Sequence, residues 1–401
     1  MPRDTPALTP SRRQFLAALG ATATATVAGC TDAQTDRPTT ESGTTETTAT
    51  PDYPATGDRV PELAPLDDAV REFAFEHDVP AATLAVAKDD DVVLERGYGY
   101  SDPGRSEQTP PDALFRIASL SKSFTSAATR SLFGDGLSPE TRVLDVLDVE
   151  PADGLGDDRL QSVTVQHLLD HSAGWDHSAA ADPMFHPFDV AEKLGLDEPP
   201  TTRDFARYVL GQPLQYEPGE RHAYSNFGYA LLGLVVEAES GQSLPAYVRE
   251  QFFGGDPPDP LYEGRALPEN RRDREVAYES AANCPNAAEL DRNEAVPCSD
   301  GGFLVSAFGG AGGLVTSART LVAFAADHRL DGFATAENFE YATAYGSLPG
   351  SYGMLQRRRD GVTVAVLFSD RGGSSNALAD IQTTVNDAVA DVDAWPSSDE
   401  S

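Results

Sequence analysis

Two stretches near opposite ends of the chain read as β-hairpins, and this pairing constrains the fold more than any other feature. Residues 82–100 place two apolar runs, ATLAVAK and VVLERGYGY, on either side of an acidic turn. Residues 351–370 have the same arrangement, with Asp360-Gly361 between SYGMLQRRR and VTVAVLFSD. Asp-Gly is a strong signal for a tight hairpin turn. The two hairpins therefore predict one antiparallel sheet built from both ends of the chain.

Apolar residues with helical spacing precede the first hairpin and follow the second. The two sets are Leu66, Val70, Phe73 and Ala74, and Leu378, Ile381, Val385, Ala388 and Val392. A spacing of three or four residues puts each set on one face of a helix. We therefore expect helices packed on the sheet.

The middle of the chain, about residues 116–334, carries mainly helical signals and long loops. We predict an α+β fold, an antiparallel sheet flanked by helices with an inserted helical lobe. The sheet would come from residues 59–115 and 335–395 of a domain spanning 59–395. A site in the crevice between sheet and lobe is expected, since ligands bind preferentially between such units.

The first 30 residues read as an export signal. SRRQFL at residues 11–16 carries twin arginines, and the weakly apolar run after it is too short to indicate a membrane-spanning helix. VAGC, ending at Cys30, matches a lipobox, although an incidental cysteine near a cleavage site would give the same letters. We expect export by the twin-arginine route and a lipid anchor at Cys30, which would place the protein at the extracellular face of the membrane.

Residues 31–58 lack any apolar period and are dominated by Thr, Pro and acidic residues. A segment of this composition cannot bury a core. It predicts a disordered tether between the anchor and the folded domain.

The formal net charge of −34 excludes nucleic acid as a partner, because phosphate binding needs clustered Lys and Arg. Of 30 basic residues only three are lysines: Lys88, Lys122 and Lys193. Such an acid excess is typical of proteins from high-salt organisms, where screening weakens self-repulsion. The simpler alternative is that the charge maintains solubility.

Cys284 and Cys298 are the remaining cysteines, 14 residues apart. In an exported chain they could form a disulfide worth about 3 kcal/mol by closing that loop, or stay as two free thiols. No His or Cys cluster surrounds them in the sequence, so no metal or other cofactor is expected.

Ser119 and Lys122 lie three residues apart in FRIASLSKSF, which puts them on one face if a helix begins near Ser119. A serine hydroxyl needs an adjacent base to become a nucleophile, and a desolvated lysine can serve as that base. Arginine cannot, because it does not give up its proton. The alternative is that Lys122 is an ordinary surface residue.

A second fragment, PGERHAYSNFGYALLG, places Tyr224 and Asn226 two residues apart. In a turn both side chains can point into one cleft, where a phenol can relay a proton and an amide can donate to a substrate carbonyl. Asn226 could equally be the N-cap of the helix that the following apolar run predicts.

Four collinear stretches resemble the serine beta-lactamase and penicillin-binding-protein-like superfamily, in its branch of class C beta-lactamases, carboxypeptidases and related esterases. They are FRIASLSKSFT, VTVQHLLDHSAGWD, PGERHAYSNFGYALLG and GGAGGLVTSARTLVAFA, within residues 60–392. The resemblance implies an antiparallel sheet with a helical lobe, and a serine hydrolase acting on a small ester, amide or peptide. It implies that Ser119 is acylated, Lys122 and Tyr224 act as bases, and Asn226 binds substrate.

The resemblance also implies an oxyanion hole formed by the Ser119 N–H and a strand carrying Gly346 and Ser347. There the chain departs from the family, which has Lys or His where this chain has Ala344. A cation that would hold a substrate carboxylate is lost, unless Tyr345 fills the space as a hydrogen-bonding group. The departure favours ester hydrolysis. The alternatives are a D-amino-acid peptidase or beta-lactamase, and a binding protein of the same fold with little turnover.

His167 and His171 lie four residues apart in HLLDH, a spacing that could hold a metal on a helix. The resemblance instead implies that one of them braces the lobe near the cleft. His177 and His186 stand among aromatic residues near the expected site, where packing is the simpler interpretation.

Overall fold

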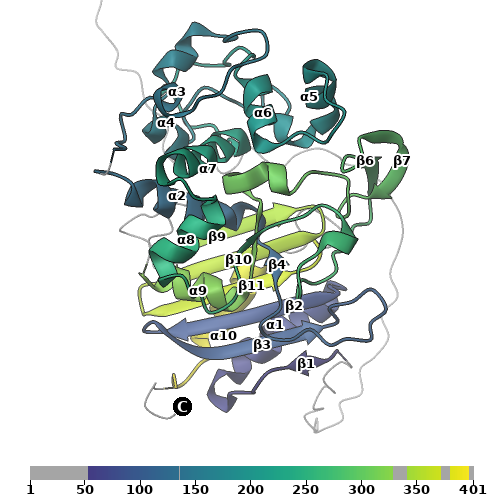
Figure 1. Cartoon of the computed structure of the whole chain (residues 1–401). Helices are drawn as coiled ribbons and strands as arrows, with labels where there is room; N and C mark the ends of the chain where they lie inside the picture. Colours follow the sequence, from purple (N-terminus) through teal and green to yellow (C-terminus); the bar gives the residue numbers. More distant parts are fainter. Residues whose placement is uncertain (1–52, 135, 328–340, 372–379, 397–401) are drawn as a thin grey trace, which may run out of the picture. The chain divides into compact units, whose positions relative to one another are not determined.

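A six-stranded antiparallel sheet, with strand order β1-β3-β2-β11-β10-β9, is the largest sheet in the described residues and lies below the helical lobe in Figure 1. The structure is a computed structural model and describes residues 53–134, 136–327, 341–371 and 380–396. Its strands are β1 (Ala55–Thr56), β2 (Ala81–Lys88), β3 (Asp91–Gly99), β9 (Tyr341–Leu348), β10 (Ser351–Arg358) and β11 (Val362–Phe368). The predicted export signal, Cys30 and all but the end of the predicted tether lie outside the described residues.

The two predicted hairpins meet at the middle of this sheet. β2 pairs with β11, and Val86 lies opposite Val364. All of β11 and nearly all of β2 is buried, because both faces of these central strands are covered. Such strands are continuously apolar rather than alternating, which explains the runs ATLAVA and VTVAVLF.

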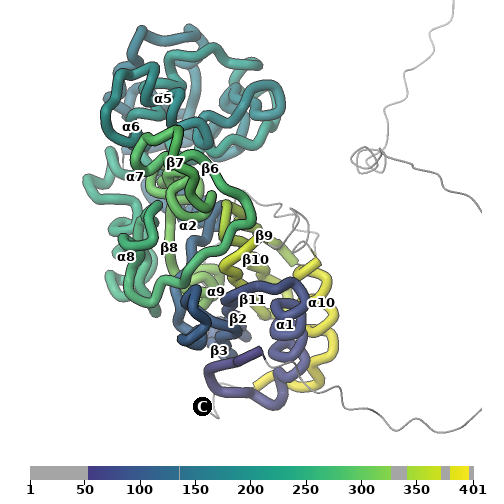
Figure 2. Tube along the Cα trace, turned by 90° about the vertical axis from the view of Figure 1, so that its right-hand side faces the viewer, coloured from purple at the N-terminus to yellow at the C-terminus, as the bar shows by residue number. Residues whose placement is uncertain are grey.

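Helices cover both faces of the sheet. On one face α1 (Ala64–Glu76) packs against α10 (Ile381–Ala390), and Figure 2 shows the two helices side by side. On the other face α9 (Ala318–Asp327) contacts β2 and β11. The fold class predicted from the sequence, an antiparallel sheet flanked by helices with a helical lobe, is confirmed.

The lobe is built around α7 (Asn226–Ser240), whose residues from Phe227 to Val236 are buried. The Ser225 hydroxyl caps its start by accepting from the Gly228 N–H, and Gly241 at φ +69° ends it. The other lobe helices are α2 (Ser121–Ser131), α3 (Val143–Val146), α4 (Val165–Leu169), α5 (Pro187–Leu194), α6 (Thr202–Val209) and α8 (Leu244–Phe253). Short 3₁₀ helices lie at η2 (Pro61–Leu63), η3 (Ala118–Leu120), η4 (Asp158–Ser162), η5 (Pro183–Phe185), η6 (Pro268–Asn270) and η7 (Ser306–Ala311).

Residues 116–334 are less purely helical than the sequence suggested. They include a small sheet, β4 (Phe115–Arg116), β8 (Leu314–Thr316) and β5 (Tyr262–Glu263), and a hairpin of β6 (Asn283–Asn286) and β7 (Asp291–Pro297). Four of these strands have only two to four residues, too few for a period-two pattern to show. β7 has seven residues, but nearly all of them are exposed, so it carries no apolar alternation. A disulfide between Cys284 and Cys298 joins the ends of this hairpin, with the two Cα atoms 4.9 Å apart.

The boundaries also differ from the prediction at two points. α9 packs on the sheet, although its sequence falls within the span assigned to the lobe. Ala55 and Thr56, which fall within the predicted tether, pair with Tyr98 and Gly97 of β3. Two paired residues carry no apolar period, so sequence composition could not separate them from a disordered segment.

None of the helices in the described ranges is long and apolar enough to span a bilayer.

Candidate active site

Ser119 lies in a tight connection between a strand and a helix. It follows β4 and sits in the single turn η3, immediately before α2. The preceding residue, Ala118, has φ +49°, a left-handed conformation that is uncommon for a residue with a side chain. Such conformations concentrate at functional sites, where the surrounding structure holds them in place. The turn leaves Ser119 half-buried at the edge of a cavity.

Lys122 lies one turn along the same segment and is fully buried. Its Nζ lies 3.1 Å from the Ser119 Oγ and donates to the Asn226 Oδ1 at 2.8 Å and to the Ala311 carbonyl oxygen. A neutral amine has two N–H groups and one lone pair. The Asn226 and Ala311 oxygens can take both N–H groups, which leaves the lone pair for the Ser119 hydroxyl.

Burial is the main reason that the pKa of Lys122 is lowered from its ordinary value, because a charged amine loses hydration inside the protein. Partial compensation comes from Tyr224 and from the carboxylate of Asp182, which favour the charged form. The lysine is thus biased toward the neutral state that a general base requires.

Tyr224 approaches the nucleophile from the lobe. Its hydroxyl lies 2.8 Å from the Ser119 Oγ, and its ring lies over the Lys122 Nζ with 4.9 Å between nitrogen and ring centroid. The residue precedes α7 and keeps 43 % of its surface exposed, so the phenol faces the cavity. The phenol and the amine therefore flank one hydroxyl, as the sequence predicted.

His171 holds the segment that carries Tyr224. Its Nδ1 accepts from the Ser225 N–H at 3.1 Å, and its carbonyl oxygen accepts from the Ala223 N–H. Its ring contacts that of Tyr224 in a tilted arrangement, with 4.6 Å between centroids. Burial, helped by the nearby Lys122, lowers the pKa of His171 to about 3, so the ring is neutral at physiological pH. This is the bracing role that the resemblance implied.

His167 takes part in capping the start of α4. Its backbone N–H donates to the Thr164 hydroxyl and its Nδ1 accepts from the Thr164 N–H, which together cap α4. Within the described ranges no group of three or more His, Cys, Asp or Glu side chains is placed to hold a metal ion.

Gly346 and Ser347 lie on β9, the edge strand nearest Ser119. A Cβ at Gly346 would collide with the Ile117 carbonyl oxygen, so only glycine lets this strand approach the turn before the nucleophile. Leu348 pairs with Ser351 across the two-residue Pro349-Gly350 turn. Hydrogen-bonded and non-bonded pairs alternate along antiparallel strands. The Ser347 N–H therefore points away from β10, toward the open edge of the sheet.

The position of the missing cation is filled by apolar packing. Ala344 is fully buried in the core between the sheet and the lobe. Tyr345 borders the Ser119 cavity but does not substitute for the cation, because its side chain packs against the core on the opposite face and its hydroxyl donates to the Gln382 Oε1 on α10. Burial raises the pKa of Tyr345 to about 12, so it carries no charge there.

Asp182 was not predicted from the sequence. Its Oδ2 accepts from the Asn226 Nδ2 at 2.7 Å, while its Oδ1 caps η5 by accepting from the Met184 N–H. Asn226 thus links Lys122 to a carboxylate, and one of its two amide N–H groups is already used. The Asp-Pro pair at the start of η5 is a capping signal, but the capping role alone gives no hint of the catalytic neighbour.

A cavity of about 420 Å³ opens onto the Ser119 hydroxyl. Its lining combines the predicted polar residues with apolar side chains. These residues are Ser119, Phe185, Tyr224, Asn226, Phe308, Ala311, Gly312, Tyr345, Ser347 and Leu348. None of them carries a charged side chain, whereas Cys284 and Cys298 take no part in the lining.

Solved structures with a similar fold include an amidase and a penicillin-binding protein homologue. The D-amino acid amidase of Ochrobactrum anthropi SV3 gives a TM-score of 0.59 at 20% sequence identity, covering 82% of this chain and 99% of the amidase. The octameric penicillin-binding protein homologue of Pyrococcus abyssi gives 0.57 at 22% identity, covering 81% of this chain and 77% of that protein. At these identities the similarity establishes the fold alone.

Sequence comparison gives the family. Protein flp of Staphylococcus aureus strain MW2 is 28% identical over 186 residues, which is 45% of this chain and 35% of flp. The chain thus matches about a third of the length of that relative. The family model described as Beta-lactamase matches residues 66–380, most of the chain. The members of this superfamily are serine hydrolases, and the chain belongs to the beta-lactamase family.

Proposed function

We propose that the protein is a serine hydrolase that cleaves neutral esters through an acyl intermediate on Ser119. The observation that carries this proposal is the convergence of one hydroxyl, one buried amine and one phenol at 2.8–3.1 Å. Neutral Lys122 takes the Ser119 proton as the Oγ attacks the ester carbonyl carbon. The carbonyl oxygen becomes an oxyanion that accepts from the backbone N–H groups of Ser119 and Ser347.

The ester C–O bond then breaks as Tyr224 donates its proton to the departing alcohol oxygen. Lys122 returns the proton that it took from Ser119 to the Tyr224 oxygen, which leaves the acyl-serine and a free alcohol. A water molecule attacks the acyl carbon while the Tyr224 oxygen takes a proton from the water and the phenol passes its own proton to neutral Lys122. The Ser119 Oγ leaves, regains a proton through Tyr224, and the carboxylic acid departs.

The substrate class follows from the cavity. Phe185, Phe308 and Leu348 offer apolar surface for an acyl chain, and no side chain of the lining offers a positive charge to a substrate carboxylate. Burying an unpaired carboxylate is costly. A neutral ester with an apolar acyl group therefore fits better than a beta-lactam or a peptide with a free carboxylate.

Amide cleavage is the second candidate, because the D-amino acid amidase shares the fold. A neutral amide also needs no cation at Ala344. Ester and amide hydrolysis differ in the leaving group, which for an amide must be protonated before it departs. Tyr224 would supply that proton in either case.

The test combines labelling with turnover. A fluorophosphonate probe should label the wild-type protein and the Ser123→Ala control but not Ser119→Ala. Ser123 is a suitable control because it is a buried serine of α2 whose hydroxyl has no hydrogen-bond partner among the described residues. Rapid hydrolysis of p-nitrophenyl butyrate supports the esterase, and faster turnover of D-phenylalanine amide would favour the amidase. Labelling without turnover of either would indicate a binding protein.

Export by the twin-arginine route and lipidation at Cys30 are part of the same proposal. They rest on the sequence alone, on Arg12-Arg13 and on VAGC. Cys30→Ser should abolish incorporation of a labelled fatty acid and release the protein from the membrane fraction. A Cys30→Ser protein that still carries label would contradict the anchor.

A further inference from the structure

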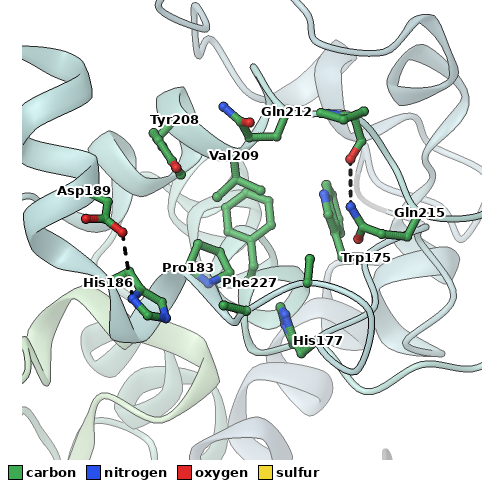
Figure 3. Close-up of a pocket in the computed structure, with 13 residues that line it drawn as sticks. Trp175, His177, Pro183, His186, Asp189, Tyr208, Val209, Gln212, Gln215 and Phe227 are labelled. Carbon is green, nitrogen blue, oxygen red and sulfur yellow. Dashed lines mark hydrogen bonds and ion pairs between the residues drawn. The ribbon is translucent and has the colours of Figure 1, made fainter.

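A second cavity lies within the lobe, and it has no part in the proposed reaction. Its volume is about 340 Å³, within the range of small-molecule sites. Figure 3 shows its apolar walls, to which Trp175, Val209, Phe227 and Pro183 contribute. The Trp175 and Phe227 rings meet edge to face, with 4.8 Å between centroids. Such walls suit a flat aromatic ligand.

Two residues that line this cavity each have a buried ring nitrogen without a hydrogen-bond partner among the residues that the structure describes. One such nitrogen is the Nε1 of Trp175, a residue only 4 % exposed, and the other is the Nε2 of His177. A buried indole N–H that donates to nothing costs free energy. The cavity therefore calls for a ligand that carries a hydrogen-bond acceptor.

The charges around the cavity argue against an anionic ligand. The Asp189 carboxylate lies on the lining, 3.9 Å from the His186 Nδ1, and the His177 Nε2 lies 3.8 Å from the Asp182 Oδ1. The net charge of the chain, −34, adds a long-range repulsion. The acceptor is better supplied by a neutral carbonyl oxygen than by a carboxylate.

Two residues that line the cavity are next in sequence to Asp182 and Asn226, the pair of residues beside Lys122. Pro183 follows Asp182, and Phe227 follows Asn226. The Asn226 amide donates to Asp182 and accepts from the Lys122 Nζ. A ligand that presses on Pro183 and Phe227 acts directly on this chain of contacts.

We propose that this cavity binds a neutral aromatic molecule bearing a carbonyl oxygen, and that its occupancy changes the rate of acylation at Ser119. The binding half of this proposal is independent of the proposed function, while the rate half rests on it. Figure 3 shows Gln215 beside Trp175 on one side, with His186 and Asp189 across the cavity. A ligand in the cavity would contact Gln215 and Trp175 on one side and His186 and Asp189 on the other.

The binding test uses benzamide and the fluorescence of Trp175 in the full-length chain. The other tryptophan, Trp395, is first replaced by Phe so that all tryptophan emission comes from the cavity. Benzamide should change this emission saturably, and it should do so equally in a Ser119→Ala background. Gln212→Phe, which puts a ring into the lining, should abolish the change, whereas the exposed Gln242→Phe should not. Unchanged emission would overturn the site.

The coupling test measures the rate at which the fluorophosphonate labels Ser119. Saturating benzamide should change this rate about fivefold or more in the Gln242→Phe control, a typical coupling between two sites, and leave it unchanged in Gln212→Phe. Equal inhibition in both variants would place benzamide at Ser119 itself and overturn the proposal. Saturable binding with no rate change would overturn the coupling. Failure to label any variant would count against the proposed function, while the emission measurement would still decide the site.

Discussion

The two walls of the candidate active site supply different things. The wall formed by η3, α2 and the start of α7 brings polar side chains, namely Ser119, Lys122, Tyr224 and Asn226. The wall formed by β9 brings backbone, because Gly346 has no side chain and Ala344 is buried in the core. Under the proposed mechanism the nucleophile and the bases are side chains of the first wall, whereas β9 supplies a backbone N–H and the position that separates anionic from neutral substrates. That position can therefore change while the reactive side chains are kept.

The largest expected effect is on the side-chain wall. Lys122→Arg replaces the neutral amine with a permanently charged guanidinium and so removes the base, since guanidinium does not deprotonate. We expect kcat/KM for p-nitrophenyl butyrate to fall roughly 10⁴-fold, the upper end for loss of a general base. The control is Lys193→Arg, a lysine paired with Asp153 on the surface. Equal activity of the two variants would assign the base to another group.

Tyr224→Phe removes only the phenol oxygen of the same wall. We expect kcat to fall about 10³-fold, because neither the leaving group nor the attacking water then exchanges a proton with a positioned acid or base. Tyr224 is 43 % exposed, so the melting temperature should stay close to that of the wild type. A small loss of kcat with an intact fold would remove Tyr224 from the proposed mechanism.

The stability of the protein should fall at acidic pH because of His171, which supports the segment that carries Tyr224. The pKa of His171 is about 3 in the fold against 6.5 for an unperturbed histidine, so the unfolded chain binds more protons between these values and stability falls as the pH drops. The loss should be about 2 kcal/mol by pH 5, measured by urea unfolding. His171→Gln should flatten this slope, and His186→Gln, at an exposed histidine, should not. An unchanged slope in His171→Gln would show that the ring is not buried neutral.

The smallest expected effect tests the backbone wall. Ala344→Lys restores a cation where the family has one, and it should shift the ratio of kcat/KM for nitrocefin over p-nitrophenyl butyrate about tenfold toward the anionic substrate. Ala342→Lys, two residues earlier on β9, is the matched control. Melting curves of both variants report whether the buried position accepts the longer side chain. Equal ratios in two folded variants would show that selection does not depend on position 344.

The sheet and the reactive side chains could be foreseen from the sequence because their signals are local. Asp360-Gly361 marks a hairpin turn, and Ser119 and Lys122 are three residues apart on one segment. Tyr224 stood out in a second fragment, and the resemblance then implied that it acts on Ser119, more than a hundred residues away. The hairpin turn and the Ser119–Lys122 spacing are short patterns that local chain geometry converts directly into proximity, whereas the approach of Tyr224 to Ser119 was expected only from the resemblance.

Other parts could not be foreseen because they depend on tertiary contacts. Asp182 meets Asn226 only after the loop before α5 folds over the start of α7. Tyr345 was a candidate substitute for the missing cation, yet the strand turns its side chain toward α10. A shift of one residue along a strand changes the face, and sequence alone does not fix which face looks into the cavity.

The pairing of β2 with β11 has a consequence for how the protein folds. Val86 and Val364, which lie opposite each other, are 278 positions apart along the chain. The centre of the sheet therefore cannot close until almost the whole polypeptide has been synthesised, and the entropy of closing so long a loop is lost before these contacts form. Folding should be slow and should depend on the last sixty or so residues. A chain that stops before β11 leaves β2 as an open, apolar edge.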